Sequence, residues 1–457
     1  MAAVCFIAGA CHHSQNKISP AAAKQARLEW NLKTLVGVYQ DIGSTDDKWD
    51  VFATNALAEF ARSRAAAFSP DEDFAGIIRT NCRAALAAGC DDPLVHYIYI
   101  KYAMEQTNSK EAFTAAFCKT ADELQQGHYP KLRQFYASLR AAEQMKYAAG
   151  TNWPPEIHHY RRQAMTDLAE ALVEKTMPIG EADEACQQML EALTQNQKQY
   201  EDCYGSIENT LFKNWPDESA VWLLKGEAYY KKAWFARGGG YADKVTDEGW
   251  KNFNENLAVA ETAAKKAWKL NPTDARIPGL MIRLDEGLQR ERPDMELWFQ
   301  RAMQINPNNY EACKYKLHFL YPQWYGSRDE MIAFGRECVA SNNWGGSVPL
   351  ILLDAHWEFC SHLQDSEEKN NYWKQPGVWP DIMASFERFF ELNPEATGWY
   401  HNYAWYAYHA EQWDKLNELI PKLGVVNYAY FGGEAEFNKM VQLAKEHARN
   451  SKTEAGK

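Results

Sequence analysis

The sequence predicts an all-α protein in which helices pack as a series of antiparallel pairs, an α-solenoid. The first observation is a recurring phrase in which a helix ends at Asn-Pro. It stands at 267–272 (AWKLNP), 302–307 (AMQINP) and 389–394 (FFELNP). The asparagines of the first two phrases are 35 residues apart, close to the period of about 34 residues shown by helical-hairpin repeats. The second observation is that apolar residues follow a helical period, without the sustained alternation of β-strands.

Small and aromatic residues occupy the positions that such a hairpin requires. Small side chains let the two helices of a pair approach each other, and aromatic side chains fill the seam to the next pair. The small positions in the units that end at Pro272 and Pro307 are Ala260, Ala264, Ala267 and Ala302. The pattern predicts a tetratricopeptide-like right-handed superhelix in which these alanines are buried between paired helices.

Start and stop signals delimit the helices of the first half. Residues 69–72 (SPDE) form a capping box with proline at the first helical position, which predicts a helix from 71. Gly43 and Gly89 are placed to end helices. The expected helices are 20–41, 46–67, 71–88, 93–106, 109–125, 129–148, 155–175 and 180–213.

The second half carries the clearer signals. Thr246 can cap a helix whose first turn holds Asp247 and Glu248, and 327–330 (SRDE) is another capping box. A Gly-rich insertion, 236–253, is expected to leave the regular stack. The expected helices are 217–235, 247–270, 274–290, 294–304, 309–320, 328–341, 348–363, 377–391, 396–410, 411–421 and 433–448.

The change in repeat character suggests four regions. Residues 1–18 are a possible remnant of an export signal, and 19–215 form a divergent region of helical pairs. Residues 216–449 form the tetratricopeptide-like repeat domain, and 450–457 form a disordered polar tail. The join between the helical regions is expected near 214–216.

Composition excludes several classes of protein. Hydrophobic residues make up 46% and charged residues 24% of the 457 residues, which indicates a globular chain. The net charge is −12 without a basic block, which argues against nucleic acid as a partner. No apolar stretch reaches 18 residues, so no transmembrane segment is expected. The ten cysteines include no CxxC pair, although Cys82 and Cys90 could form a disulfide if the chain turns back after Gly89.

The N-terminus admits two interpretations. Residues 2–10 (AAVCFIAGA) are apolar, and 8–10 fit a small-x-small cleavage site followed directly by Cys11. They are either a frayed end or the tail of an export signal whose start lies upstream, since no basic region precedes them. The second interpretation predicts a mature protein that begins near Cys11, with a possible lipid anchor there, in the periplasm or cell envelope. The first leaves a cytoplasmic protein.

Several phrases resemble a group of bacterial tetratricopeptide-like proteins of uncharacterised function. They are ARGGGYADKVTDEGW (236–250), PQWYGSRDEMIAFGREC (322–338), NNWGGSVPLILLDAHWE (342–358) and NYAWYAYHAEQWDKL (402–416), and AAGCDDPLVHY (87–97) extends the resemblance more weakly. The resemblance implies a helical-repeat scaffold, often exported. It supplies no catalytic residue and no cofactor.

Motifs for chemistry are weak. The glycines of 238–240 lack the Lys-Ser/Thr and the preceding strand of a phosphate loop. His356 and Cys360 share a helix face, but His362 is rotated away and no further donor completes a zinc site. The adjacent histidines at 12–13 and at 158–159 point in different directions and are not expected to share a metal. No GxSxG motif, which marks a nucleophilic serine, occurs. We therefore expect neither an enzyme nor a metal or cofactor site.

The sequence leaves two functional hypotheses. The first is a non-enzymatic scaffold that binds a protein or peptide partner on its concave face, with the insertion folded over the groove edge and anchored by Tyr241 or Trp250. The alternative is an accessory helical domain of a cell-envelope system that captures a small ligand or glycan at the Trp-rich C-terminal end. The tentative binding residues are Tyr241, Trp250, Trp344, Trp379, Trp399, Tyr400 and Trp405.

Overall fold

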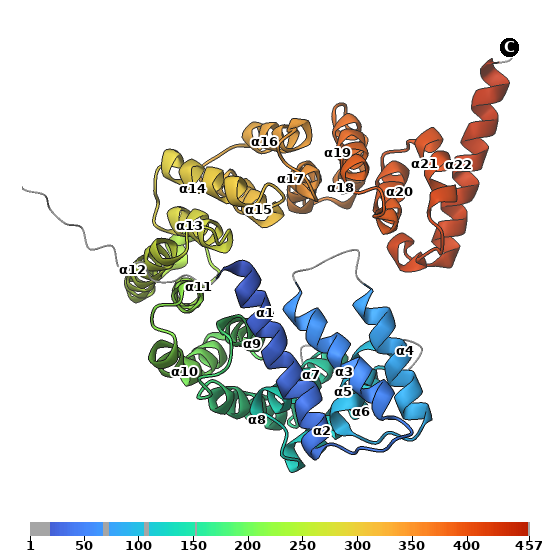
Figure 1. The fold of residues 1–457 in the computed structure, drawn as a ribbon. Coiled ribbons are helices and arrows are strands. Elements are labelled where there is room, and N and C mark those ends of the chain that lie inside the picture. Colours follow the sequence, from blue (N-terminus) through green and yellow to red (C-terminus); the bar gives the residue numbers. More distant parts are fainter. Residues whose placement is uncertain (1–18, 67–72, 105–108, 151–152, 456–457) are drawn as a thin grey trace, which may run out of the picture. The chain divides into compact units, whose positions relative to one another are not determined.

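The computed structural model describes residues 19–66, 73–104, 109–150 and 153–455, and these form helices joined by turns (Figure 1). The described residues contain no strand. The chain is thus an all-α protein of many packed helices, as predicted. None of the described helices is both long enough and apolar enough to cross a membrane.

The chain divides into two compact units. The first ends at Phe253 and the second begins at Asn254, so the boundary lies within the long helix α12 (Asp247–Leu270). The division expected near 214–216 marks where the repeat phrases begin in the sequence. It does not concern which residues pack into one compact unit. That division stays a prediction.

The first unit is a succession of helices of ten to nineteen residues, with one short helix, α2. A π-helical turn at Lys33–Gly37 joins α1 to α2. The helices are α1 (Pro20–Leu32), α2 (Val38–Ile42), α3 (Asp50–Ala65), α4 (Phe74–Ala87), α5 (Pro93–Tyr102), α6 (Lys110–Gln126), α7 (Lys131–Ala149), α8 (Ile157–Ala171), α9 (Ile179–Ala192), α10 (Gln197–Asn214) and α11 (Ser219–Arg237).

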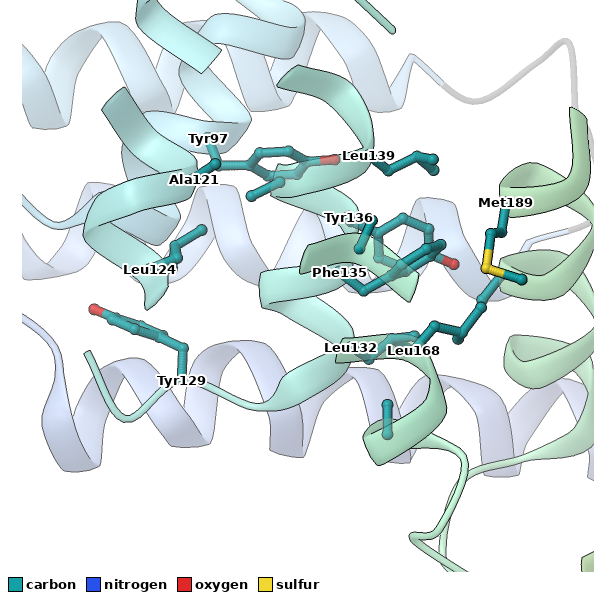
Figure 2. Packing of buried hydrophobic residues seen from close by; sticks show 14 of the residues in the cluster. Tyr97, Ala121, Leu124, Tyr129, Leu132, Phe135, Tyr136, Leu139, Leu168 and Met189 are labelled. Atoms are coloured by element: carbon teal, nitrogen blue, oxygen red, sulfur yellow. The ribbon is translucent and has the colours of Figure 1, made fainter. Parts of the chain in front are cut away.

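Helices that follow one another in the sequence pack against one another. The most extensive contacts join α3 to α4, α6 to α7 and α7 to α8. Leu132, Phe135 and Leu139 of α7 lie in this core, with Leu124 of α6 and Leu168 of α8 (Figure 2). Sequential pairing of this kind is what an array of helical hairpins requires.

A buried ion network holds the first helix against the ninth. The side chain of Glu181 on α9 is fully buried and accepts hydrogen bonds from Arg27 of α1 (2.7 Å) and Arg64 of α3 (2.6 Å). Burial alone would raise the pKa of Glu181, but the guanidinium groups outweigh it and lower that pKa to about 2. The carboxylate therefore ties three helices that are distant in sequence.

The second unit continues from α12 with shorter helices and single turns of 3₁₀-helix. The helices are α13 (Arg276–Gly287), α14 (Arg292–Ile305), α15 (Tyr310–Phe319), α16 (Arg328–Ala340), α17 (Ile351–His362), α18 (Ser366–Tyr372), α19 (Val378–Leu392), α20 (Tyr400–His409), α21 (Trp413–Leu419) and α22 (Glu434–Ala455). The 3₁₀ turns of this unit include η3 (Val348–Leu350), η4 (Thr397–Trp399) and η6 (Tyr428–Phe431).

The repeat phrases end helices where the sequence predicted. Helices α12, α14 and α19 stop at the residue before each Asn-Pro. Ala260, Ala264, Ala267 and Ala302 are fully buried, as predicted. Thr246 accepts a hydrogen bond from the Gly249 amide (3.0 Å) at the start of α12. At the start of α16, Ser327 Oγ and Glu330 form the predicted capping box.

The predicted and observed elements differ at four places. The helix expected at 180–213 is two helices, because the Asn196 side chain accepts a hydrogen bond from the Gln199 amide (3.0 Å) and starts α10. Of the insertion expected over 236–253, only 238–246 lies between α11 and α12, and 247–253 belong to α12, whose start at 247 was predicted. Helix α18 was not expected, and α22 continues beyond the predicted end at 448.

Three further predictions concern a disulfide, the capping box at 69–72 and the N-terminal segment. Cys82 and Cys90 do not form a disulfide, since both are buried free thiols, and burial raises the pKa of Cys82 to about 12. The capping box at 69–72 lies outside the described residues, and α4 is capped instead by Asp73. The apolar segment before Cys11, and Cys11 itself, also lie outside them.

Candidate functional site

The second unit contains a pocket lined largely by aromatic side chains. Its volume is about 380 Å³, within the usual range for small-ligand sites. Helices α15, α17 and α20 form it, together with the turns η3, η4 and η6. The aromatic lining consists of Tyr310, Trp357, Trp399, Trp405, Tyr406 and Tyr430.

Helical spacing brings the lining residues of each helix to one face. On α17, Trp357 follows Asp354 by three residues and Leu353 by four, so its side chain lies on the same face as each of them. Asn402, Trp405 and Tyr406 have the same spacing on α20. Two helical faces therefore meet across the pocket.

His401 holds the two turns that complete the rim. Its Nε2 accepts a hydrogen bond from the backbone amide of Asn427 (3.1 Å), which leaves the Nδ1 hydrogen to be donated to the Gly398 carbonyl (3.2 Å). The first bond fixes the loop that carries Tyr430, and the second fixes the turn that carries Trp399. The His401 ring also lies 5.6 Å from that of Tyr430.

A cluster of three tryptophans forms one wall. The ring centres of Trp357, Trp373 and Trp405 lie 5.8 to 6.0 Å from one another. Trp373 is buried behind the other two, whereas Trp357 is 51% exposed. Mutual packing restricts the rotamers of these rings, so the wall is formed before any ligand arrives.

Asp354 is the only carboxylate among the described residues that line the pocket. The Tyr310 hydroxyl donates a hydrogen bond to its Oδ2. Burial raises the pKa of Asp354 above its usual value, although the Tyr310 hydrogen bond and Lys314 oppose that change. No basic side chain in the described part of the chain forms an ion pair with Asp354. Lys314 pairs instead with Glu311 (3.6 Å).

The His-Cys-His cluster considered from the sequence is not a ligand set. His356 is buried and bonded to the Tyr372 hydroxyl (2.8 Å) and to Asp381 (3.0 Å), so it joins α17 to α18 and α19. Cys360 faces the Lys369 carbonyl (3.7 Å), and His362 is exposed. No three His, Cys, Asp or Glu side chains in the described ranges converge as metal ligands.

The structure brings together only two of the seven tentative binding residues. Trp399 and Trp405 line the pocket, whereas the other three of the second unit are half-buried against neighbouring aromatic rings. Trp344 contacts Phe299 (5.6 Å), Trp379 stacks on Tyr403 (6.0 Å) and Tyr400 stacks on Phe390 (4.2 Å).

Tyr241 and Trp250 belong to the first unit, at the loop between α11 and α12. Tyr241 is 86% exposed, so of the two alternative anchors it is not the buried one. Trp250 is half-buried, with its ring 5.7 Å from that of Phe253 and the Arg237 guanidinium 5.4 Å from its centre. Of the two predicted anchors, Trp250 is the one that packs.

The sequence did not lead us to predict the Asp354 carboxylate of the pocket or most of its aromatic lining. Asp354 interrupts an apolar run, and Trp357 follows it three residues later on the same helix face. That spacing could have marked Asp354 and Trp357 as a pair of candidate binding residues. Tyr310 and Tyr430 carry no local signal, because they reach the pocket only through tertiary packing.

No protein-family model matches this chain, and a search of curated proteins gives no match. The functional argument therefore rests on the geometry of the pocket.

Proposed function

We propose that this protein is a non-enzymatic binding protein that captures its ligand in the aromatic pocket of the second unit. In this proposal the helices form a tetratricopeptide-like superhelical frame, and the pocket receives either a small ligand or a side chain of a protein or peptide partner. The observation that carries the proposal is a compact, pre-organised aromatic pocket with one carboxylate in its lining.

The exposure of the rim supports binding over simple core packing. Trp399 and Tyr430 are 39% and 44% exposed, and Trp357 is more exposed still. Large aromatic groups left facing water are a cost that buried aromatics such as Phe386 do not carry. Here they converge on one cavity, and His401 holds two of them in place. A surface that gathers apolar area in this way is suited to a partner.

The chemistry of the lining supports binding over catalysis. Acid–base catalysis usually combines a proton donor or acceptor with a second group that positions or activates it. Asp354 is hydrogen-bonded to Tyr310, and the remaining lining offers phenols, one amide and apolar side chains. Such a set can recognise a ligand but offers no activated nucleophile.

A fluorine NMR screen tests the proposal. The protein is labelled with 5-fluorotryptophan, and a chemically diverse small-molecule library is added. We expect hits to shift the resonances of Trp399 and Trp405, while that of Trp250 in the first unit stays unchanged. The substitution Trp357→Ala should abolish the shifts, and Trp250→Ala should not. Hits that shift other tryptophans and survive Trp357→Ala would refute the proposed site.

A further inference from the structure

The carboxylate of the pocket forms no ion pair with the described residues. Asp354 has the Tyr310 hydroxyl as its hydrogen-bond partner, and no lysine, arginine or histidine of the described residues forms an ion pair with it. His409 lies against Trp405, with ring centres 4.0 Å apart, but burial and the nearby Lys374 lower its pKa and favour the neutral ring. The pocket thus presents a carboxylate whose one direct polar partner among the described residues is a neutral phenol, with Lys314 acting on it only from a distance.

The aromatic rings of the pocket also lack the partners that other rings in the unit have. The Arg301 guanidinium lies 4.3 Å from the centre of the Trp298 ring, and that of Arg328 lies 5.0 Å from Phe359. Among the described residues, no lysine or arginine covers Trp357, Trp399, Trp405, Tyr406 or Tyr430, although the imidazole rings of His409 and His401 lie near Trp405 and Tyr430. Only Tyr310, at the edge, has a lysine near its ring, Lys314 at 5.7 Å.

Ring faces and a carboxylate attract the same kind of ligand. The face of an aromatic ring is negative, so it attracts a cation that is weakly hydrated and can leave water at small cost. A carboxylate adds a directional ion pair to the same group. An anion would be repelled by both features. A sugar would find hydrogen-bond partners in Asp354, Asn402, the phenols and the indole N–H groups of the lining, but it would gain no ion pair with the carboxylate, so charged and neutral probes distinguish the two ligand classes.

We propose, on the basis of the ligand-binding function above, that the pocket selects an organic cation, a guanidinium or alkylammonium group. The cation lies against the tryptophan wall with its charge directed to the Asp354 carboxylate. It is carried either by a free small molecule or by an arginine or lysine side chain of a peptide. The two sources share the same recognition chemistry.

Matched pairs of charged and neutral probes test this inference by calorimetric titration of the full-length protein. The pairs are choline with 3,3-dimethylbutanol, and acetyl-Gly-Arg-Gly-amide with its citrulline counterpart. We expect each cation to bind at least about tenfold more tightly than its neutral isostere, the size of a desolvated cation–π contact with an ion pair. An Arg peptide that binds far more tightly than arginine amide identifies a peptide source, and equal affinities identify a free ligand.

Two variants assign the effect to the pocket. Asp354→Asn keeps the shape of the side chain, and we expect it to weaken cation binding about tenfold with little effect on the neutral probes. Asp329→Asn, at an exposed position of α16, is the matched control and should leave the affinities unchanged. Circular dichroism checks the fold, and if Asp354→Asn does not fold, Trp357→Leu at the exposed rim replaces it and should weaken cation binding.

The outcomes separate this inference from the proposed function. Neutral probes that bind as well as cations, or cation binding that is unchanged in Asp354→Asn, would overturn the cation inference. If sugars or other neutral hits of the screen shift the Trp399 and Trp405 resonances while no cation binds, the cation inference fails. The proposed ligand-binding function is kept in that case. If nothing shifts the pocket tryptophans, both proposals fail.

Discussion

Replacing Asp285 by asparagine should stabilise the protein above neutral pH. Asp285 lies on α13 with only 3% of the residue exposed, and its Oδ2 is buried without a hydrogen-bond donor among the described residues. Burial is the main cause that raises its pKa to about 7, and the nearby carboxylate of Asp294 adds to this. Asparagine cannot ionise, so it removes the cost of placing a charge there.

The size and the sign of this stabilisation follow from the linkage between proton binding and folding. The pKa of Asp285 is about 7 in the folded state and about 3.9 in an unfolded chain, so between these values the folded state binds more protons. The contribution of Asp285 to stability is therefore highest below about pH 4 and falls as the pH rises towards 7. A pKa difference of this size corresponds to about 4 kcal/mol, and relaxation around the site reduces it to about 2 kcal/mol.

Urea denaturation at pH 5 and pH 8 measures the effect. We expect Asp285→Asn to raise the free energy of unfolding of the second unit by about 2 kcal/mol at pH 8 and by much less at pH 5. Asp243→Asn, an exposed aspartate of the first unit, should change neither value. A gain that is the same at both pH values, or a loss at pH 8, would refute the reasoning.

Four further predictions test the frame and the site. Glu181→Gln removes the carboxylate that Arg64 needs and should cost about 3–5 kcal/mol in urea denaturation at pH 7; in the wild type the stability from Glu181 should be lost as the pH falls from about 4.5 towards 2. A loss below 1 kcal/mol would contradict the network. Ala264→Trp should overpack its buried position and cost about 1–3 kcal/mol in thermal unfolding, and no change would contradict close helix packing there. His401→Ala should weaken ligand binding measured by titration while the helical circular dichroism is kept, and unchanged affinity would argue against its positioning role. Replacing 238–246 by a Gly-Ser linker should leave both helicity and pocket affinity unchanged, and loss of binding would move the site towards that loop.

The sequence predicted the frame more completely than the pocket. Asn-Pro after an apolar residue is a local stop signal, so the ends of α12, α14 and α19 could be placed from sequence. The break before α10 was missed because Asn196 interrupts the helix by its side-chain capping bond, with no glycine or proline to mark it.

The pocket itself is a tertiary feature. Trp399 and Trp405 were predicted from the density of tryptophans, but the same reasoning included Trp344 and Trp379, which are packing residues. Density cannot separate a ring that faces a cavity from one that faces a neighbouring helix. Which rings face the cavity depends on how α15, α17 and α20 pack against one another, and no local sequence pattern predicts that packing.

A crystal structure of the full-length protein with its tightest-binding probe tests the central claim most directly. We expect the ligand to lie in the pocket, against Trp357 and Trp405 and within hydrogen-bonding reach of Asp354. A ligand bound elsewhere, with the pocket occupied only by solvent, would contradict the account.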